Sequence, residues 1–209
     1  MMNRRTALKN LGLSVGALGM APAIGSLLQS CETAPSWTPQ FFSGAQAQLL
    51  ELLVETIIPE TDIPGGKSLQ LAPQLDLMVA TVAEEEQKQI LTQLFDQFTA
   101  SLQTDHGGIA VSKVQAAHID AQLAKYLRAS AEQQQAWSTE IDAAEEANSP
   151  LTDEAASYLF AGQIRSLTVR VFKTNEYIGE NVLAYAPIPG QQQGCVDLQE
   201  TTGGKAWSL

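Results

Sequence analysis

Residues 43–66 have the sequence SGAQAQLLELLVETIIPETDIPGG. Ser43 is a good N-cap residue, and the leucines and isoleucines after it recur at the spacing of one face of an α-helix. The run ends at Pro59, because the two prolines and two glycines of residues 59–66 fix or free the backbone where a helix cannot continue. This stretch predicts a buried helix followed by a defined turn.

Apolar stretches with helical spacing recur along the rest of the chain. They predict helices over residues 73–82, 84–102, 113–127, 130–147 and 152–177. Residues 178–209 show neither a helical period nor a strand of convincing length. We therefore expect an all-α fold: a single domain at residues 43–209, with about five to six helices and an irregular C-terminal tail at residues 178–209.

Residues 1–30 have the features of an export signal that is removed or lipidated. Arg4 and Arg5 precede an uncharged stretch, and the pair resembles a twin-arginine signal, which directs folded cargo out of the cytoplasm. We expect the chain to be exported to the periplasmic side of a bacterial cell envelope.

The end of this segment leaves alternatives open. Cleavage at Ala23 would release a soluble chain, whereas the lipobox-like sequence that ends at Cys31 would place lipid on that cysteine. We favour lipidation of Cys31, with residues 31–42 as a tether. A retained transmembrane helix is a third reading, and the four glycines and one proline within residues 11–28 argue against it.

The charge balance is strongly acidic. The chain has 12 Lys and Arg against 23 Asp and Glu, and residues 1–30 hold three of the cations and none of the acids. The remainder therefore carries nine positive and 23 negative charges, a net of −14, which repels nucleic acid and anionic lipid. If Cys31 is lipidated, Cys195 has no partner within the chain, and it is then buried, reduced or paired with another chain.

The sequence predicts no catalytic, cofactor-binding or metal-binding residue. The chain has no Cys-x-x-Cys pair, and His106 and His118 lie twelve residues apart, so we interpret both histidines as structural or solvent-facing. No Gly-x-Gly-x-x-Gly fingerprint and no Gly-x-Ser-x-Gly elbow is present. An exported chain without its own chemistry favours a subunit, chaperone or binding module.

Two stretches resemble the gluconate 2-dehydrogenase subunit 3 family. One is the turn at residues 57–66, IIPETDIPGG. The other is the C-terminal segment, with KTNE at 173–176, LAYAPIPG at 183–190, GCVDL at 194–198 and KAW at 205–207.

This resemblance implies a non-catalytic accessory subunit of a membrane-associated dehydrogenase. In such a complex, FAD and catalysis belong to a large partner subunit of the glucose-methanol-choline type, which acts on a sugar, sugar acid or alcohol. A cytochrome c subunit is a possible electron acceptor. The small subunit supports folding of the flavoprotein and carries it out through its own twin-arginine signal. A free-standing envelope lipoprotein that binds a ligand or organises the envelope is the alternative.

The tail supplies the candidate partner contacts. Its prolines limit the entropy lost on docking and its aromatic residues can serve as buried anchors. The alternative is that the tail packs on its own helices and completes the core. The candidate interface residues are Tyr185, Pro187, Pro189, Gly190, Cys195 and Trp207.

Overall fold

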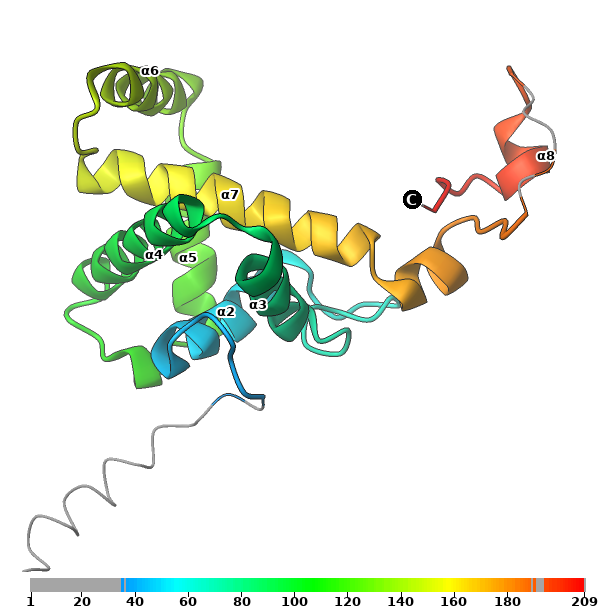
Figure 1. Ribbon diagram of the computed structural model, residues 1–209, viewed down its shortest axis with the longest axis horizontal. Helices are drawn as coiled ribbons and strands as arrows, with labels where there is room; N and C mark the ends of the chain where they lie inside the picture. Colours follow the sequence, from blue (N-terminus) through cyan, green and yellow to red (C-terminus); the bar gives the residue numbers. More distant parts are fainter. Residues whose placement is uncertain (1–34, 36, 189, 191–193, 209) are drawn as a thin grey trace, which may run out of the picture. The chain divides into compact units, whose positions relative to one another are not determined.

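The computed structural model describes residues 35, 37–188, 190 and 194–208, and these residues form an all-α domain (Figure 1). The α-helices are α2 (Gly44–Ile57), α3 (Leu71–Val82), α4 (Glu85–Asp105), α5 (Ala116–Leu127), α6 (Ala131–Ala147), α7 (Asp153–Lys173) and α8 (Leu198–Thr202). A 3₁₀ helix, η1 (Val111–Lys113), and a π-helix, η2 (Ile178–Val182), lie between them. The predicted fold class is confirmed. The export residues Arg4 and Arg5, the lipidation candidate Cys31 and the interface candidate Pro189 lie outside the described residues.

Helix α2 begins where its sequence predicts. The Ser43 hydroxyl accepts a hydrogen bond from the Gln46 N–H at 3.3 Å, and the Gln46 side chain accepts one from the Ser43 N–H at 3.1 Å. This capping box satisfies two of the backbone donors that a helix start leaves without partners. The helix ends at Ile57, two residues before Pro59.

Several helix boundaries differ from the sequence expectation, since α3 begins at Leu71 and not at residue 73, and α4 ends at Asp105 and not at residue 102. The stretch 113–127 divides into η1 and α5, because Val114 and Gln115 are extended and the backbone N–H of Gln115 donates to the His118 ring at the start of α5. Helix α7 ends at Lys173, before the predicted end at residue 177. The hydrogen bond between Gln115 and His118 competes with helix continuation at residue 115, and hydrophobic periodicity gives no sign of it.

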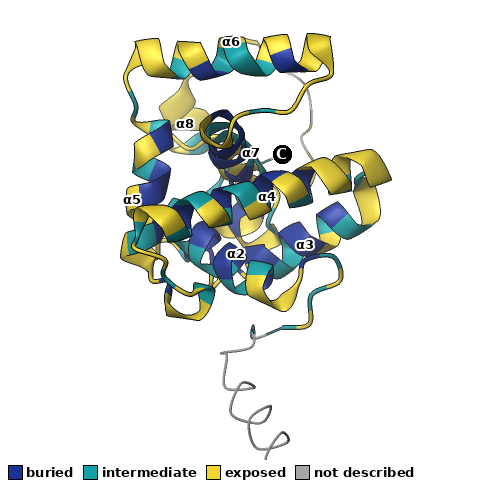
Figure 2. Cartoon of the chain, turned by 90° about the vertical axis from the view of Figure 1, so that its left-hand side faces the viewer, coloured by how far each residue is buried: buried dark blue, intermediate teal, exposed yellow. Residues whose placement is uncertain are grey.

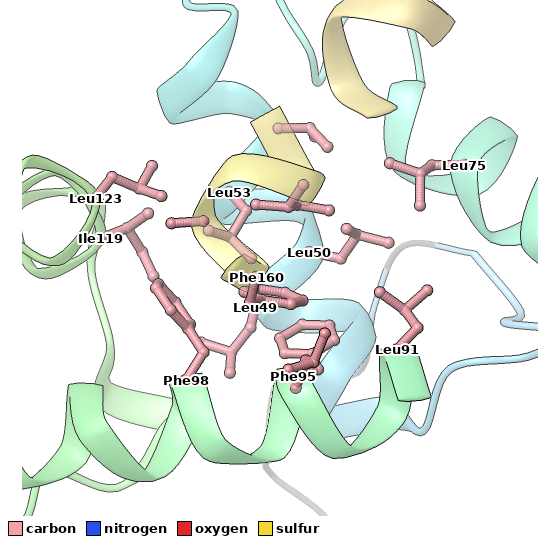
Figure 3. Close-up of a cluster of buried hydrophobic side chains, with 14 of the residues drawn as sticks. Leu49, Leu50, Leu53, Leu75, Leu91, Phe95, Phe98, Ile119, Leu123 and Phe160 are labelled. Carbon is pink, nitrogen blue, oxygen red and sulfur yellow. The ribbon is translucent and has the colours of Figure 1, made fainter. Parts of the chain in front are cut away.

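Helix α7 is the centre of the domain. It contacts α2, α3, α4, α5, α6 and η2, and Figure 2 shows that most buried residues lie on α7 and on the helices beneath α6. Phe160 of α7 stacks on Phe95 of α4 with ring centroids 4.7 Å apart, and Phe98 follows at 5.0 Å (Figure 3). All three rings are fully buried, and burial of each stabilises the fold by about 2–3 kcal/mol. This ring cluster fixes α4 against α7.

Helix α6 is attached mainly through one residue. Trp137 is buried between Tyr126 of α5 and Tyr158 of α7, with ring centroids at 5.6 and 5.1 Å. Apart from Trp137 and Ala144, the residues of α6 are exposed or only partly buried. The helix therefore covers α7 loosely, and its acidic face is solvated as its sequence indicates.

The end of the expected tether is part of the domain. Phe42 is buried in the core against Phe95, and the Asp76 carboxylate in α3 accepts hydrogen bonds from the backbone N–H groups of residues 40, 41 and 42 at 2.7–3.1 Å. Asp76 is itself buried, so these three donors satisfy a carboxylate that would otherwise be very unfavourable inside the protein. The contact fixes where the chain enters the helical domain.

The C-terminal tail has more structure than its sequence suggests. It begins with η2, whose first residue, Ile178, is completely buried. Further on, Ala184 and residues 206–208 exchange two backbone hydrogen bonds of 2.8 Å, and α8 lies within the loop that this bridge closes. The expectation of a wholly irregular tail is therefore corrected at these two helices and this bridge.

Candidate partner interface

Two carboxylates hold the turn after α2, and Glu55 accepts hydrogen bonds from the Glu60 N–H at 3.3 Å and the Lys67 N–H at 2.7 Å. Glu60 accepts hydrogen bonds from the Gly65 N–H at 2.8 Å and from the Ser68 hydroxyl at 2.6 Å. The Ser68 and Gly65 hydrogen bonds favour the charged form and lower the pKa of Glu60 below its ordinary value. The turn is thus closed around an ionised carboxylate.

Two glycines in this turn are required by close backbone approach. A Cβ atom on Gly65 would lie 2.5 Å from the backbone nitrogen of Glu60, and one on Gly66 would lie 2.6 Å from the Val54 carbonyl oxygen. The Gly66 N–H also donates to the Ile58 carbonyl at 2.7 Å. The two glycines therefore let the turn fold back onto the end of α2.

The segment after α7 is anchored beside this turn. The Asn175 side chain donates to Gln74 of α3 at 3.4 Å and accepts from the Tyr177 N–H at 3.1 Å. With Ile178 buried next to it, the segment 175–181 is fixed against the domain at its root.

The turn and the segment 175–181 line one open cleft of about 560 Å³. More than 100 residues separate them in the sequence, and the turn lies in one stretch that resembles the family while Asn175 and Glu176 lie in the other. The lining residues are Glu60, Pro64, Ser68, Leu69, Gln70, Asn175, Glu176, Tyr177, Glu180 and Asn181.

The cleft has an acidic lining. Its lining has three carboxylates, contributed by Glu60, Glu176 and Glu180, and no histidine, cysteine, lysine or arginine. The carboxylates would attract a cationic group and repel a phosphate.

The predicted tail residues are exposed where the structure describes them. Tyr185 and Trp207 each expose 52% of their surface, and Pro187, Gly190 and Cys195 are also exposed. Trp207 is held in place by the bridge to Ala184. In this structure neither aromatic residue completes the core.

Sequence reasoning missed further apolar residues of the tail. Ile188 is 87% exposed and is one of several large apolar side chains that the tail exposes. We define the apolar tail by the five exposed large apolar residues among the described part of residues 178–209, which are Tyr185, Ile188, Val196, Leu198 and Trp207. The sequence offered one sign of these exposed residues: each is a large apolar residue in a segment without a helical repeat of apolar residues.

His106 and His118 lie side by side, although they are twelve residues apart in the sequence. The rings of His106 and His118 lie 4.8 Å apart between centroids, because the chain reverses between α4 and α5. Nδ1 of His118 accepts a hydrogen bond from the Gln115 N–H at 3.1 Å, so this ring caps the start of α5. Over the described part of the chain, no group of three or more His, Cys, Asp or Glu residues could hold a metal ion.

Comparison with known proteins gives one result. The family model for gluconate 2-dehydrogenase subunit 3 matches residues 44–190, which include the turn, the cleft and the first part of the tail. A search of curated proteins and a search of solved structures found no match. No helix within the described ranges is long and apolar enough to cross a membrane. Because the matched range covers most of the chain, the protein belongs to the gluconate 2-dehydrogenase subunit 3 family.

Proposed function

We propose that this chain is a non-catalytic accessory subunit that supports the folding and export of an FAD-dependent dehydrogenase. The partner would be a large flavoprotein of the glucose-methanol-choline type that oxidises a sugar, a sugar acid or an alcohol. The family match over residues 44–190 carries this proposal, because the family is described as a subunit of gluconate 2-dehydrogenase.

The apolar tail supports a role in assembly. Five large apolar side chains stay exposed in a segment that begins at a buried isoleucine and is closed by a backbone bridge. A pre-ordered segment of this kind loses little conformational entropy when it docks. Aromatic residues such as Tyr185 and Trp207 are typical anchors of protein interfaces.

The charge of the cleft supports placing FAD in the partner. FAD carries a pyrophosphate, and the carboxylates of Glu60, Glu176 and Glu180 would repel it. In this proposal the flavoprotein binds FAD and carries out the oxidation, and electrons pass from it to an acceptor such as a cytochrome c subunit.

Export and anchoring belong to the same proposal. Arg4 and Arg5 would direct the folded complex through the twin-arginine route, and a lipidated Cys31 would hold it at the periplasmic face of the membrane. Lipidation of Cys31 is also compatible with a free-standing lipoprotein, and this alternative differs in needing no enzyme partner.

Co-purification tests the proposal. We expect the affinity-tagged full chain, expressed in its own host, to copurify with a large subunit that shows flavin absorbance and reduces a dye when sugar is added. The chain expressed alone should be a stable helical protein with neither property. An unrelated partner without flavin, or a chain that functions in the envelope without any enzyme, would contradict the proposal and favour the alternative.

A further inference from the structure

An open groove on α7 shares no lining residue with the cleft and none with the apolar tail. It is about 500 Å³ in volume, and the end of α5, one residue of α6 and the middle of α7 line it. Leu127, Tyr158, Leu159 and Leu167 form its apolar surface, and each is only partly buried. A groove of this kind can accept the apolar face of another helix.

Gly162 lies in this groove, near the middle of the 21-residue helix α7. Glycine in a helix interior is destabilising relative to alanine, so a glycine there calls for a compensating reason. At Gly65 and Gly66 the reason is backbone crowding, but a Cβ on Gly162 would meet no atom within 4 Å. Nothing within the described residues of this chain requires glycine at position 162.

The polar groups beside Gly162 already have hydrogen-bond partners within α7. The Ser166 hydroxyl donates to the Gly162 carbonyl at 2.9 Å, so this pair can be covered by another surface without an unsatisfied donor. Gly162 and Ser166 lie one turn apart and both line the groove, so they leave room for a second backbone to approach α7 closely.

Arg165 sets the charge that an occupant must carry. Its side chain lines the groove, is exposed, and forms no salt bridge within the residues that the structure describes. It is one of only nine cations after residue 30, against 23 acids. An occupant with a carboxylate at this position would be attracted, whereas a second copy of this acidic chain would be repelled overall.

We infer that the α7 groove docks an amphipathic helix of the flavoprotein subunit, with a small residue against Gly162 and a carboxylate paired with Arg165. This inference rests on the proposed function, because it names the partner of that proposal. It adds a contact on the helical domain, separate in sequence from the apolar tail. Two contacts to one partner strengthen each other because the second forms within an already bound complex.

The test uses the full chain and the purified flavoprotein that copurifies with it. Gly162→Leu fills the groove, and Arg165→Glu reverses its charge. We expect each variant to raise the Kd for the flavoprotein by about tenfold or more, and Arg165→Glu also to weaken the salt dependence of association. The Tm of the isolated chain should not fall, because position 162 faces open space and Arg165 is exposed.

Two matched variants serve as controls. Gly44→Leu places the same side chain at another open helical glycine, and Lys113→Glu reverses another exposed cation. We expect both to bind the flavoprotein with the wild-type Kd. If Gly162→Leu is folded and binds as well as wild type, or if Arg165→Glu does so, the groove inference is overturned while the proposed function stands. If the wild-type chain binds no flavoprotein at all, the proposed function fails, and the inference with it.

Discussion

Asp76 illustrates how one residue determines where the chain enters its domain. Its buried carboxylate holds three successive backbone N–H groups of the segment that leads into α2. Sequence analysis did not single it out, because an aspartate in an apolar helix has no readable partner until a segment about 35 residues away is placed beside it. The same applies to the pairing of Asn175 with Gln74.

Substitution of Asp76 tests this contact. Asp76→Ala should lower the free energy of unfolding by roughly 2–5 kcal/mol, because it leaves buried N–H donors without an acceptor. Urea denaturation of the two proteins measures the difference. Asp142→Ala, at an exposed position within α6, is the control and should change stability by less than about 0.5 kcal/mol. Equal effects of the two substitutions would show that the Asp76 contact contributes nothing.

Lys125 joins three helices and makes stability depend on pH. Its ammonium group donates to Asp105 of α4 at 2.8 Å and to Glu154 of α7 at 2.9 Å. Burial opposes its charge, but these hydrogen bonds outweigh burial and raise the pKa of Lys125. The hydrogen bond from Lys125 lowers the pKa of Asp105.

The sign of the pH effect follows from these shifts. A raised lysine pKa stabilises the fold below the ordinary value of about 10.4, and this contribution is lost as pH rises through the folded pKa. A lowered aspartate pKa stabilises the fold above about 3.9, and this contribution is lost as pH falls through the folded pKa. The contacts of Lys125 therefore stabilise the protein across neutral pH and weaken towards both extremes.

Lys125→Met measures that contribution. About a third of the lysine side chain is exposed, so we expect a loss of only about 1 kcal/mol in unfolding free energy at pH 7 and a smaller loss near pH 2.5. Lys88→Met removes only a pair within α4 and should have a weaker effect. A penalty for Lys125→Met that stays constant with pH would instead assign its role to packing on the Tyr126 ring.

At the scale of elements, the sequence predicted the long helices, but neither the helix η2 at the start of the tail nor the cleft. Periodicity and capping located α2 because Ser43 and Pro59 act on their neighbours in the chain. The cleft joins a turn near residue 60 to a segment near residue 178, and no local signal reports that proximity. Residues 57–66 and 173–176 both resemble the family, but that resemblance does not predict that they lie side by side.

The apolar tail is the element on which partner binding should depend most. Tyr185→Ser combined with Ile188→Ser should raise the Kd for the flavoprotein by about tenfold or more, since both residues are exposed enough to act as interface anchors. The Tm of the isolated chain should change little, because neither side chain completes the core. Binding and calorimetry on the same preparations measure the two effects.

Val82→Ser provides the control for the tail variant. Val82 is 74% exposed at the end of α3, outside the tail, so its replacement removes a comparable exposed apolar group. We expect it to bind the flavoprotein as wild type does. Equal losses of binding in both proteins would mean that the tail has no special role.

At the scale of the whole molecule, a helical domain with an acidic surface, an exposed apolar tail and an open groove on α7 is suited to holding another protein. Sequence composition indicated the absence of obvious chemistry, and the family match connects the domain to an oxidoreductase. The geometry of the groove could not be predicted, because it depends on how α6 crosses α7.

The export proposal is tested by replacing both arginines. Arg4→Lys combined with Arg5→Lys keeps the positive charge of the signal but removes the paired arginines that the twin-arginine route reads. We expect the precursor and the flavoprotein to accumulate together in the cytoplasm, as measured by immunoblots of cell fractions. A flavoprotein that still reaches the periplasm while this chain is retained would contradict co-export.

Dye-linked sugar oxidation by the purified chain, the purified flavoprotein and their complex, recorded with the flavin absorbance of each sample, tests the central claim most directly. The account predicts activity and flavin absorbance in every sample that contains the flavoprotein and none in the chain alone. Flavin bound by the isolated chain, or sugar oxidation by it, would contradict the account.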